Sequence, residues 1–74
     1  MTWNYRVVVD TRHEEALPEV CEVYYDENGP YAYGRAVIMG ENKEDLMKEL
    51  QRFKDAIEKY DWLAYPRDFH NTEY

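Results

Sequence analysis

The strongest local signal in the sequence is the stretch DENGP, residues 26–30. Asn28-Gly29 supplies the positive-φ positions that hairpin turns require. Pro30 has no backbone N–H with which to close a strict two-residue turn, so we expect a longer turn with Gly29 in the left-handed conformation. The stretch therefore predicts a β-hairpin, and the fold is built outward from the strands on either side of it.

Alternating apolar and polar residues next to this turn predict two strands, over residues 19–25 and 31–39. An earlier strand is predicted over residues 3–10, where large apolar residues alternate with polar ones. Residues 11–18 are charged, lose the alternation and end in a proline, which predicts an exposed connection. The three strands follow one another closely enough to form an antiparallel meander.

A helix is predicted over residues 43–60, after the last strand. Asn42 is followed three residues later by Asp45, the spacing of a capping box at a helix N-terminus. Apolar residues then recur at alternating steps of four and three, which predicts one buried stripe along the helix. The residues of this stripe are Leu46, Leu50, Phe53, Ile57 and Tyr60.

The remaining segment, residues 61–74, is too irregular for another long element and too aromatic for an idle linker. We expect it to dock on the rest of the chain through its aromatic side chains. The sequence therefore predicts a single α+β domain over residues 1–74. Its architecture is a three-stranded antiparallel β-meander packed on one α-helix (β-β-β-α), with an irregular aromatic C-terminal tail.

The charge of the chain restricts its partners. Sixteen acidic and nine basic residues among 74 give a net charge of -7 at pH 7. This balance favours basic protein surfaces and opposes contact with phosphate backbones and anionic lipid. The sequence also has no leader pattern and no run of about 20 apolar residues that would span a membrane. We expect a cytoplasmic protein that binds another protein and makes no direct contact with nucleic acid or membrane.

The cysteine and histidine content indicates neither a disulfide nor a metal site. Cys21 is the single cysteine, which suits a reducing compartment, and we expect it to be a buried apolar residue of a strand. His13 and His70 are far apart in the sequence, and no CxxC or HxxxH spacing accompanies them. We expect both histidines at the surface, and we expect no metal and no cofactor.

Catalysis is also disfavoured by the sequence. Carboxylates are abundant, but paired acid–base chemistry needs two of them in different, shielded environments inside a cleft, which 74 residues rarely build. The sequence contains no nucleophile elbow, no Ser/His/Asp spacing and no glycine-rich phosphate loop. We therefore expect a protein that is not an enzyme.

Two resemblances follow from these motifs. The opening TWNYRVV, residues 2–8, and the hairpin EVYYDENG, residues 22–29, followed by a helix rich in Glu and Leu, resemble a group of small uncharacterised bacterial proteins without an assigned activity. The β-β-β-α order, with GENKEDL at residues 40–46 entering the helix, is similar in outline to the partial-fold domain of HicB-type antitoxins. The second resemblance implies toxin neutralisation, but the sequence lacks that family's Asp-Leu-Pro-Gly-Cys-like segment and its appended DNA-binding element.

The distribution of aromatic residues raises the question of what covers the sheet. One helix can cover one face of a three-stranded sheet, yet bulky side chains are predicted on both faces. Either the tail folds over the second face, or that face is an interface for another protein or for a second copy of the chain. The candidate contact residues combine acidic charge with aromatic rings around the hairpin. They are Glu22, Tyr24, Tyr25, Asp26, Glu27, Tyr31 and Tyr33.

The sequence thus predicts a non-catalytic, acidic, protein-binding domain. Negative charge beside flat rings can imitate a nucleic acid and occupy the basic surface of a nucleic-acid-handling protein. An inhibitor or accessory factor of this kind would act as a phage or plasmid anti-defence protein, such as an anti-CRISPR, or as an antitoxin. The alternatives are a structural or regulatory subunit of a larger assembly or a homodimer, and, as a distant third, a small enzyme or ligand-binding protein.

Overall fold

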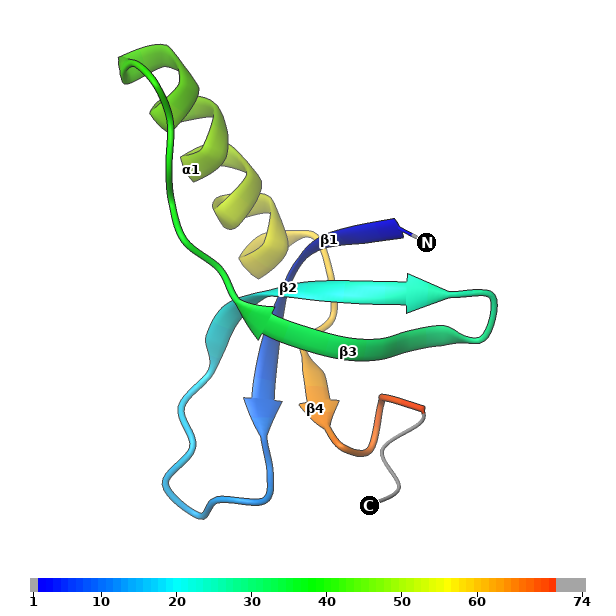
Figure 1. The fold of residues 1–74 in the computed structure, drawn as a ribbon. Helices are drawn as coiled ribbons and strands as arrows, with labels where there is room; N and C mark the ends of the chain where they lie inside the picture. Colours follow the sequence, from blue (N-terminus) through cyan, green and yellow to red (C-terminus); the bar gives the residue numbers. More distant parts are fainter. Residues whose placement is uncertain (1, 71–74) are drawn as a thin grey trace.

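The computed structural model describes residues 2–70, so residues 71–74 of the predicted tail lie outside the described part of the chain. It contains a four-stranded sheet and one helix (Figure 1). The elements in chain order are β1 (Thr2–Asp10), β2 (Glu19–Asp26), β3 (Gly29–Arg35), α1 (Lys43–Glu58) and β4 (Leu63–Tyr65). The strands lie in the order β3-β2-β1-β4. The predicted α+β meander with one helix is therefore confirmed, with a short fourth strand added.

The hairpin between β2 and β3 forms where the sequence predicts it. Gly29 has a φ of 108°, the left-handed conformation that only glycine adopts without strain. The backbone N–H of Asn28 donates to Asp26 Oδ1 at 2.8 Å, which stabilises the turn. Asp26 pairs with Gly29 and Tyr25 with Pro30, and the register shifts between Tyr24 and Tyr25. The proline is thus accommodated beside an irregularity in the ladder, where its missing N–H is tolerated.

The third strand ends earlier than predicted. β3 stops at Arg35, which pairs with Cys21 of β2, so the predicted strand over residues 36–39 is wrong. Residues 36–41, which we call the strap, leave the sheet and run alongside α1 to its N-terminus (Figure 1). The strap has to reach Asn42, whose side chain accepts a hydrogen bond from the Asp45 N–H at 2.9 Å and so caps the helix as predicted.

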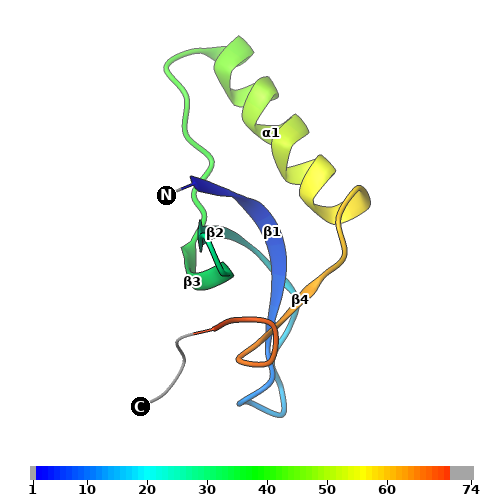
Figure 2. The same ribbon diagram turned by 90° about the vertical axis from the view of Figure 1, so that its right-hand side faces the viewer.

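The helix covers one face of the sheet with the part that runs from Glu49 to its C-terminus. The Tyr5 ring packs on Phe53 with ring centroids 4.6 Å apart, and Ala56 is the buried residue of α1. Tyr5 Oη donates to Glu49 Oε2 at 2.7 Å. The N-terminal half of α1 rises away from the sheet, as the two perpendicular views show (Figures 1 and 2). The predicted apolar stripe therefore packs on the sheet only in part.

The tail covers the opposite face. β4 pairs parallel with β1, with Val8 beside Leu63 and Asp10 beside Tyr65. Phe69 is 5% exposed and joins Val8, Cys21 and Val23 in the buried core cluster. The tail therefore docks as predicted and holds no long element, but residues 63–65 of it form a short strand that the sequence did not predict. That short strand forms because the free edge of β1 supplies its hydrogen-bonding partners.

Within residues 2–70, no helix is both long enough and apolar enough to cross a membrane.

Candidate functional site

Two of the predicted contact tyrosines are committed to internal contacts. Tyr25 Oη donates to Asn4 Oδ1 at 2.7 Å and accepts from Arg6 Nη1 at 3.1 Å. Tyr33 Oη lies 3.2 Å from Asp10 Oδ2, and its ring packs on two aromatic rings of the tail. The centroids of Tyr65 and Phe69 lie 4.9 and 5.5 Å from it. Tyr25 and Tyr33 therefore belong to the face that the tail covers, and they hold the tail in place.

Tyr24 and Glu22 lie on the other face of β2, because side chains alternate along a strand. Tyr24 Oη donates to Glu22 Oε1 at 2.6 Å. This hydrogen bond is the main cause of the raised pKa of Tyr24, since it stabilises the protonated phenol beside a carboxylate. Gly34 of β3 lies next to the Tyr24 hydroxyl, and a Cβ there would be 4.0 Å from it, an ordinary van der Waals distance.

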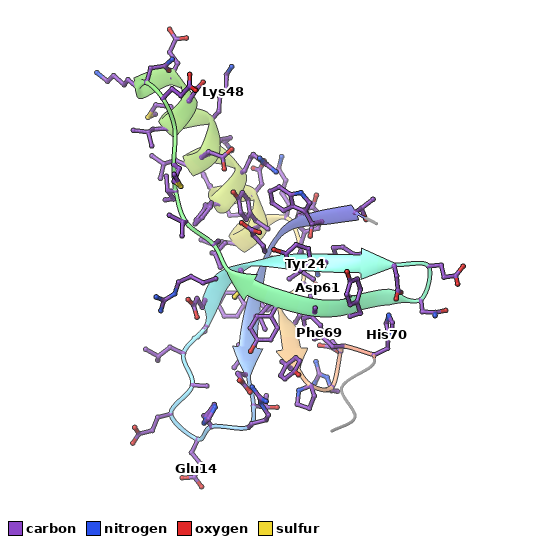
Figure 3. The ribbon with its side chains drawn as sticks, viewed as in Figure 1. Glu14, Tyr24, Lys48, Asp61, Phe69 and His70 are labelled. Carbon is purple, nitrogen blue, oxygen red and sulfur yellow. The ribbon has the colours of Figure 1, made fainter. Side chains whose placement is uncertain are left out.

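Asp26 and Glu27 are exposed at the tip of the hairpin. His70 Nε2 of the tail lies 2.7 Å from Asp26 Oδ1, and the His70 N–H donates to the Pro30 carbonyl at 3.0 Å (Figure 3). The Tyr31 ring lies 6.1 Å from the His70 ring. The seven predicted contact residues thus divide between two faces and a tip, and only the tip presents its carboxylates to solvent.

Charge is distributed unevenly along the chain. Residues 2–42 carry eight acidic and three basic side chains, whereas α1 carries five acidic and four basic ones. None of the charged side chains within residues 2–70 is buried. The strands and loops that precede the helix therefore present a strongly negative surface, while the helix is close to neutral.

A cluster around Asp10 was not identified from the sequence. Arg12 holds Asp10 with two side-chain hydrogen bonds, from Nε to Oδ1 at 2.9 Å and from Nη2 to Oδ2 at 2.7 Å. These bonds hold the pKa of the Asp10 carboxyl well below its usual range. His13 Nε2 lies 3.8 Å from the same carboxylate. The signal that could have located this cluster is the two-residue spacing of Asp10 and Arg12 at the end of a strand.

A cavity of about 250 Å³ adjoins this cluster and contains Cys21. Cys21 is 2% exposed, and burial raises the pKa of its thiol to about 11. The thiol is therefore protonated at neutral pH, and the Asp10 carboxylate is already neutralised by a guanidinium. This pairing stabilises the end of β1 but offers neither an activated nucleophile nor a free general base.

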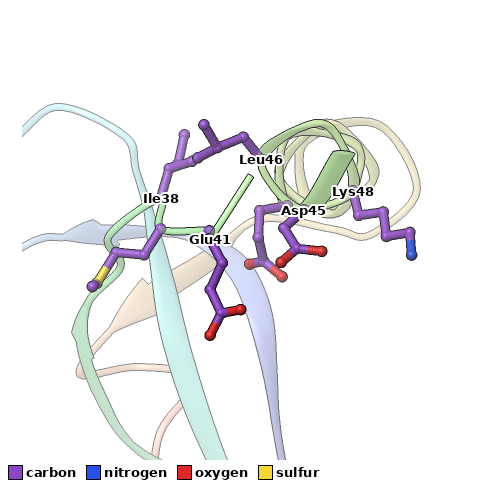
Figure 4. Close-up of a pocket in the computed structure, with 8 residues that line it drawn as sticks. Ile38, Glu41, Asp45, Leu46 and Lys48 are labelled. Atoms are coloured by element: carbon purple, nitrogen blue, oxygen red, sulfur yellow. The ribbon is translucent and has the colours of Figure 1, made fainter. Parts of the chain in front are cut away.

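The largest uncovered apolar area lies on the strap and the helix. We call it the helix–strap face. Each of its apolar side chains exposes between 38% and 73% of its surface. They are Val37, Ile38, Met39, Leu46, Met47, Leu50 and Ile57. A groove of about 620 Å³ runs between the strap and the first two turns of α1 (Figure 4). Sequence analysis missed this face because it placed residues 36–39 in the sheet.

Within residues 2–70, no group of three or more His, Cys, Asp or Glu side chains lies close enough together to hold a metal ion.

Comparisons of the chain with protein-family models, with curated proteins and with solved structures found no match.

Proposed function

We propose that this chain is a non-catalytic, protein-binding domain that acts in the cytoplasm and uses its acidic sheet half to engage a basic surface of another protein. The observation that carries the proposal is the concentration of eight acidic and only three basic side chains in residues 2–42, all of them outside the core. Such a surface steers association with a positively charged partner and repels polyanions.

The hairpin tip is the part of this surface best placed to enter a partner. Asp26 and Glu27 are exposed there, and the turn that carries them is held by Gly29 and by the contact with His70. A rigid acidic tip loses little conformational entropy on binding, which favours affinity as well as association rate. Tyr24 and Tyr31 flank it and supply flat apolar area of the kind found at the centre of interfaces.

A partner with a basic surface large enough to match this half of the molecule is typical of proteins that handle nucleic acids. The chain would occupy the surface that otherwise holds the phosphate backbone. We therefore propose an inhibitor or accessory factor of a nucleic-acid-handling protein, of the anti-defence or antitoxin type.

The state of the reactive groups supports a function without catalysis. Cys21 is buried and protonated, and Asp10 is paired with Arg12. Both groups are explained by the stability of the fold.

Affinity capture from cells of the native host, followed by calorimetry with the purified partner, tests this proposal. The variant Glu27→Lys reverses the charge of an exposed side chain at the tip, and we expect it to weaken binding roughly tenfold at low salt because like charges then meet. Binding of the unmodified protein is expected to weaken as salt rises.

Glu14→Lys is the matched control, since Glu14 is an exposed carboxylate in the loop between β1 and β2, far from the tip (Figure 3). It makes the same change in net charge. Equal affinity of the two variants would show that only total charge matters and would contradict the role of the tip. An affinity independent of salt would contradict the electrostatic proposal as a whole.

A second candidate function, a structural or regulatory subunit that assembles through an apolar contact, is supported by a different observation. The helix–strap face carries seven apolar side chains, each of which leaves at least 38% of its surface exposed. Exposed apolar patches of this size mark contact sites in many proteins.

A further inference from the structure

The helix–strap face exists because the sheet is too short for the helix. Tyr5 of β1 contacts α1 at Glu49 and Phe53, and Ala56 is the buried residue of the helix. Leu46 and Leu50, one turn apart, belong to the stripe that sequence periodicity assigns to a packing surface, yet they are 38% and 46% exposed. The N-terminal part of the stripe, at Leu46 and Leu50, is therefore only partly covered by the described residues.

The strap forms a fixed wall beside this stripe. At Gly40 the strap approaches the first turn of α1 so closely that a Cβ would lie 2.8 Å from Asp45 Cβ and 2.9 Å from the Leu46 nitrogen. Only glycine permits this approach. Ile38 and Met39 are held next to Leu46 as a result, and the groove between them is open to solvent (Figure 4).

The exposed apolar area of this face approaches that of one interface of standard size. The seven apolar side chains of the helix–strap face together leave on the order of 400 Å² of apolar surface uncovered. A homodimer interface of standard size buries about 800 Å² on each subunit, of which roughly 500 Å² is apolar. The face thus provides most of the apolar area of one complete interface.

The charge distribution indicates which occupant covers it. Two copies of a chain with a net charge of -7 repel one another over most of their surface. The helix as a whole is close to neutral, with five acidic and four basic side chains, although the groove at its N-terminal end is lined by Glu41, Asp45 and Glu49 beside Lys48. It is therefore the element on which two copies can meet with the least like-charge repulsion, and a basic partner has more to gain at the acidic half.

We propose that the helix–strap face is a self-association surface on which two copies of this chain pack α1 against α1 about a two-fold axis. In this arrangement the stripe of Leu46, Leu50 and Ile57 meets the same stripe of the second copy, and Met47 enters the groove between strap and helix. A single patch that contacts itself closes the assembly at two copies. The acidic halves remain free, so the dimer presents two hairpin tips to solvent.

Sedimentation equilibrium of the full chain and of two variants tests this inference. Leu50→Glu puts a charge in the centre of the stripe, and a two-fold axis brings two such charges into one interface. We expect it to raise the dimer dissociation constant by about 100-fold, as changes at the centre of an interface do. Leu17→Glu is the matched control, because Leu17 is 81% exposed in the loop between β1 and β2 and lies outside the face.

The supporting result is a dimer that Leu50→Glu dissociates and that Leu17→Glu leaves intact, with circular dichroism showing that both variants fold. A wild-type chain that sediments as a monomer at every concentration would overturn the inference and leave the face to a different partner. A dimer that Leu50→Glu does not weaken would also overturn it and would place the contact elsewhere, for example at the free edge of β3.

A cysteine variant provides a second measurement. Leu50→Cys places a thiol beside the two-fold axis, so we expect a disulfide-linked dimer under mild oxidation, whereas Leu17→Cys remains a monomer on a denaturing gel. Cys21 does not interfere because it is 2% exposed. The inference fails if both variants cross-link equally. Neither experiment involves the acidic tip, so its result is independent of the proposed function.

Discussion

His70 Nε2 and Asp26 Oδ1 lie 2.7 Å apart, which joins the end of the described tail to the tip of the hairpin. The backbone repeats the connection, since the His70 N–H donates to the Pro30 carbonyl at 3.0 Å. This latch closes the side of the sheet on which Phe69 is buried. It also fixes the tip that we propose as the contact for a basic partner, so one side-chain contact joins the tail to the proposed binding site.

The latch predicts a dependence of stability on acid. Desolvation raises the pKa of Asp26, but hydrogen bonds from the Asn28 N–H and from His70 outweigh it and leave the pKa lowered. A lowered folded-state pKa stabilises the fold above the ordinary value of 3.8, and this contribution is lost as pH falls below about 4. We expect Asp26→Asn to make the free energy of unfolding less sensitive to pH in this range, as measured by urea unfolding.

Asparagine at this position keeps an oxygen for the Asn28 N–H, so the turn itself is retained. A double-mutant cycle with His70→Gln then isolates the coupling between the two side chains. Zero coupling energy at pH 5, where Asp26 is ionised, would contradict the latch.

The burial of the Phe69 ring indicates how much the tail contributes to the free energy of unfolding. The ring is 5% exposed and packs on Tyr33 and on Tyr65, with centroids 5.5 and 5.2 Å away. Replacing a buried phenylalanine by alanine costs about 3–5 kcal/mol, and a chain of this length has roughly 4–11 kcal/mol in total. We expect Phe69→Ala to lose about 3–5 kcal/mol of the free energy of unfolding and Phe69→Leu to lose less, as measured by thermal unfolding.

Leu17→Ala is the control for this series, since an 81% exposed side chain is expected to change stability by less than about 0.5 kcal/mol. A Phe69→Ala variant as stable as this control would show that the tail does not seal the sheet.

Features set by neighbouring residues could be predicted from the sequence. The turn at Asn28-Gly29 and the cap formed by Asn42 with Asp45 depend on a few consecutive residues, and both are found where expected. The end of β3 and the formation of β4 depend on where partner strands stop and where an edge is free. Such information lies far away in the sequence, so these features were missed.

The same reasoning explains the outcome for the candidate site. Tyr25 and Tyr33 are of a residue type that is common at interfaces. They are instead packed inside the molecule, because the core cluster with Phe69, and for Tyr33 also Tyr65, comes from a segment more than thirty residues further along the chain. The stripe containing Leu50 was correctly identified as apolar. Only the structure shows that the sheet reaches half of the helix and leaves the remainder uncovered.

The buried thiol of Cys21 is expected to react with thiol reagents only when the protein unfolds. Cys21 is 2% exposed, so a reagent does not reach its sulfur in the folded protein. Burial also raises the pKa of the thiol to about 11, so the reactive thiolate is scarce at neutral pH. We expect a thiol reagent to label it only as fast as the protein opens. In Leu17→Cys the new, exposed thiol should react at once and Cys21 slowly. Two equally fast phases would contradict the burial of Cys21.

The raised pKa of Tyr5 predicts that the free energy of unfolding decreases at alkaline pH. Burial, followed by the hydrogen bond to Glu49, raises the pKa of Tyr5 from 10.0 to about 12. Above pH 10 the unfolded chain ionises this phenol while the folded chain does not, so the stabilisation is complete below pH 10 and is lost as pH rises towards 12. A shift of about two pKa units corresponds to a loss of about 3 kcal/mol at most.

The variant Tyr5→Phe tests this linkage, because it removes the ionisable group and keeps the ring that packs on Phe53. We expect it to be less stable than the unmodified protein at neutral pH, by about 1 kcal/mol for the lost hydrogen bond, yet to lose less stability between pH 10 and pH 12. Tyr60→Phe is the control, since its ring is 48% exposed at the end of the helix. If both variants follow the same alkaline curve in urea unfolding, the contact between Tyr5 and Glu49 does not couple the sheet to the helix.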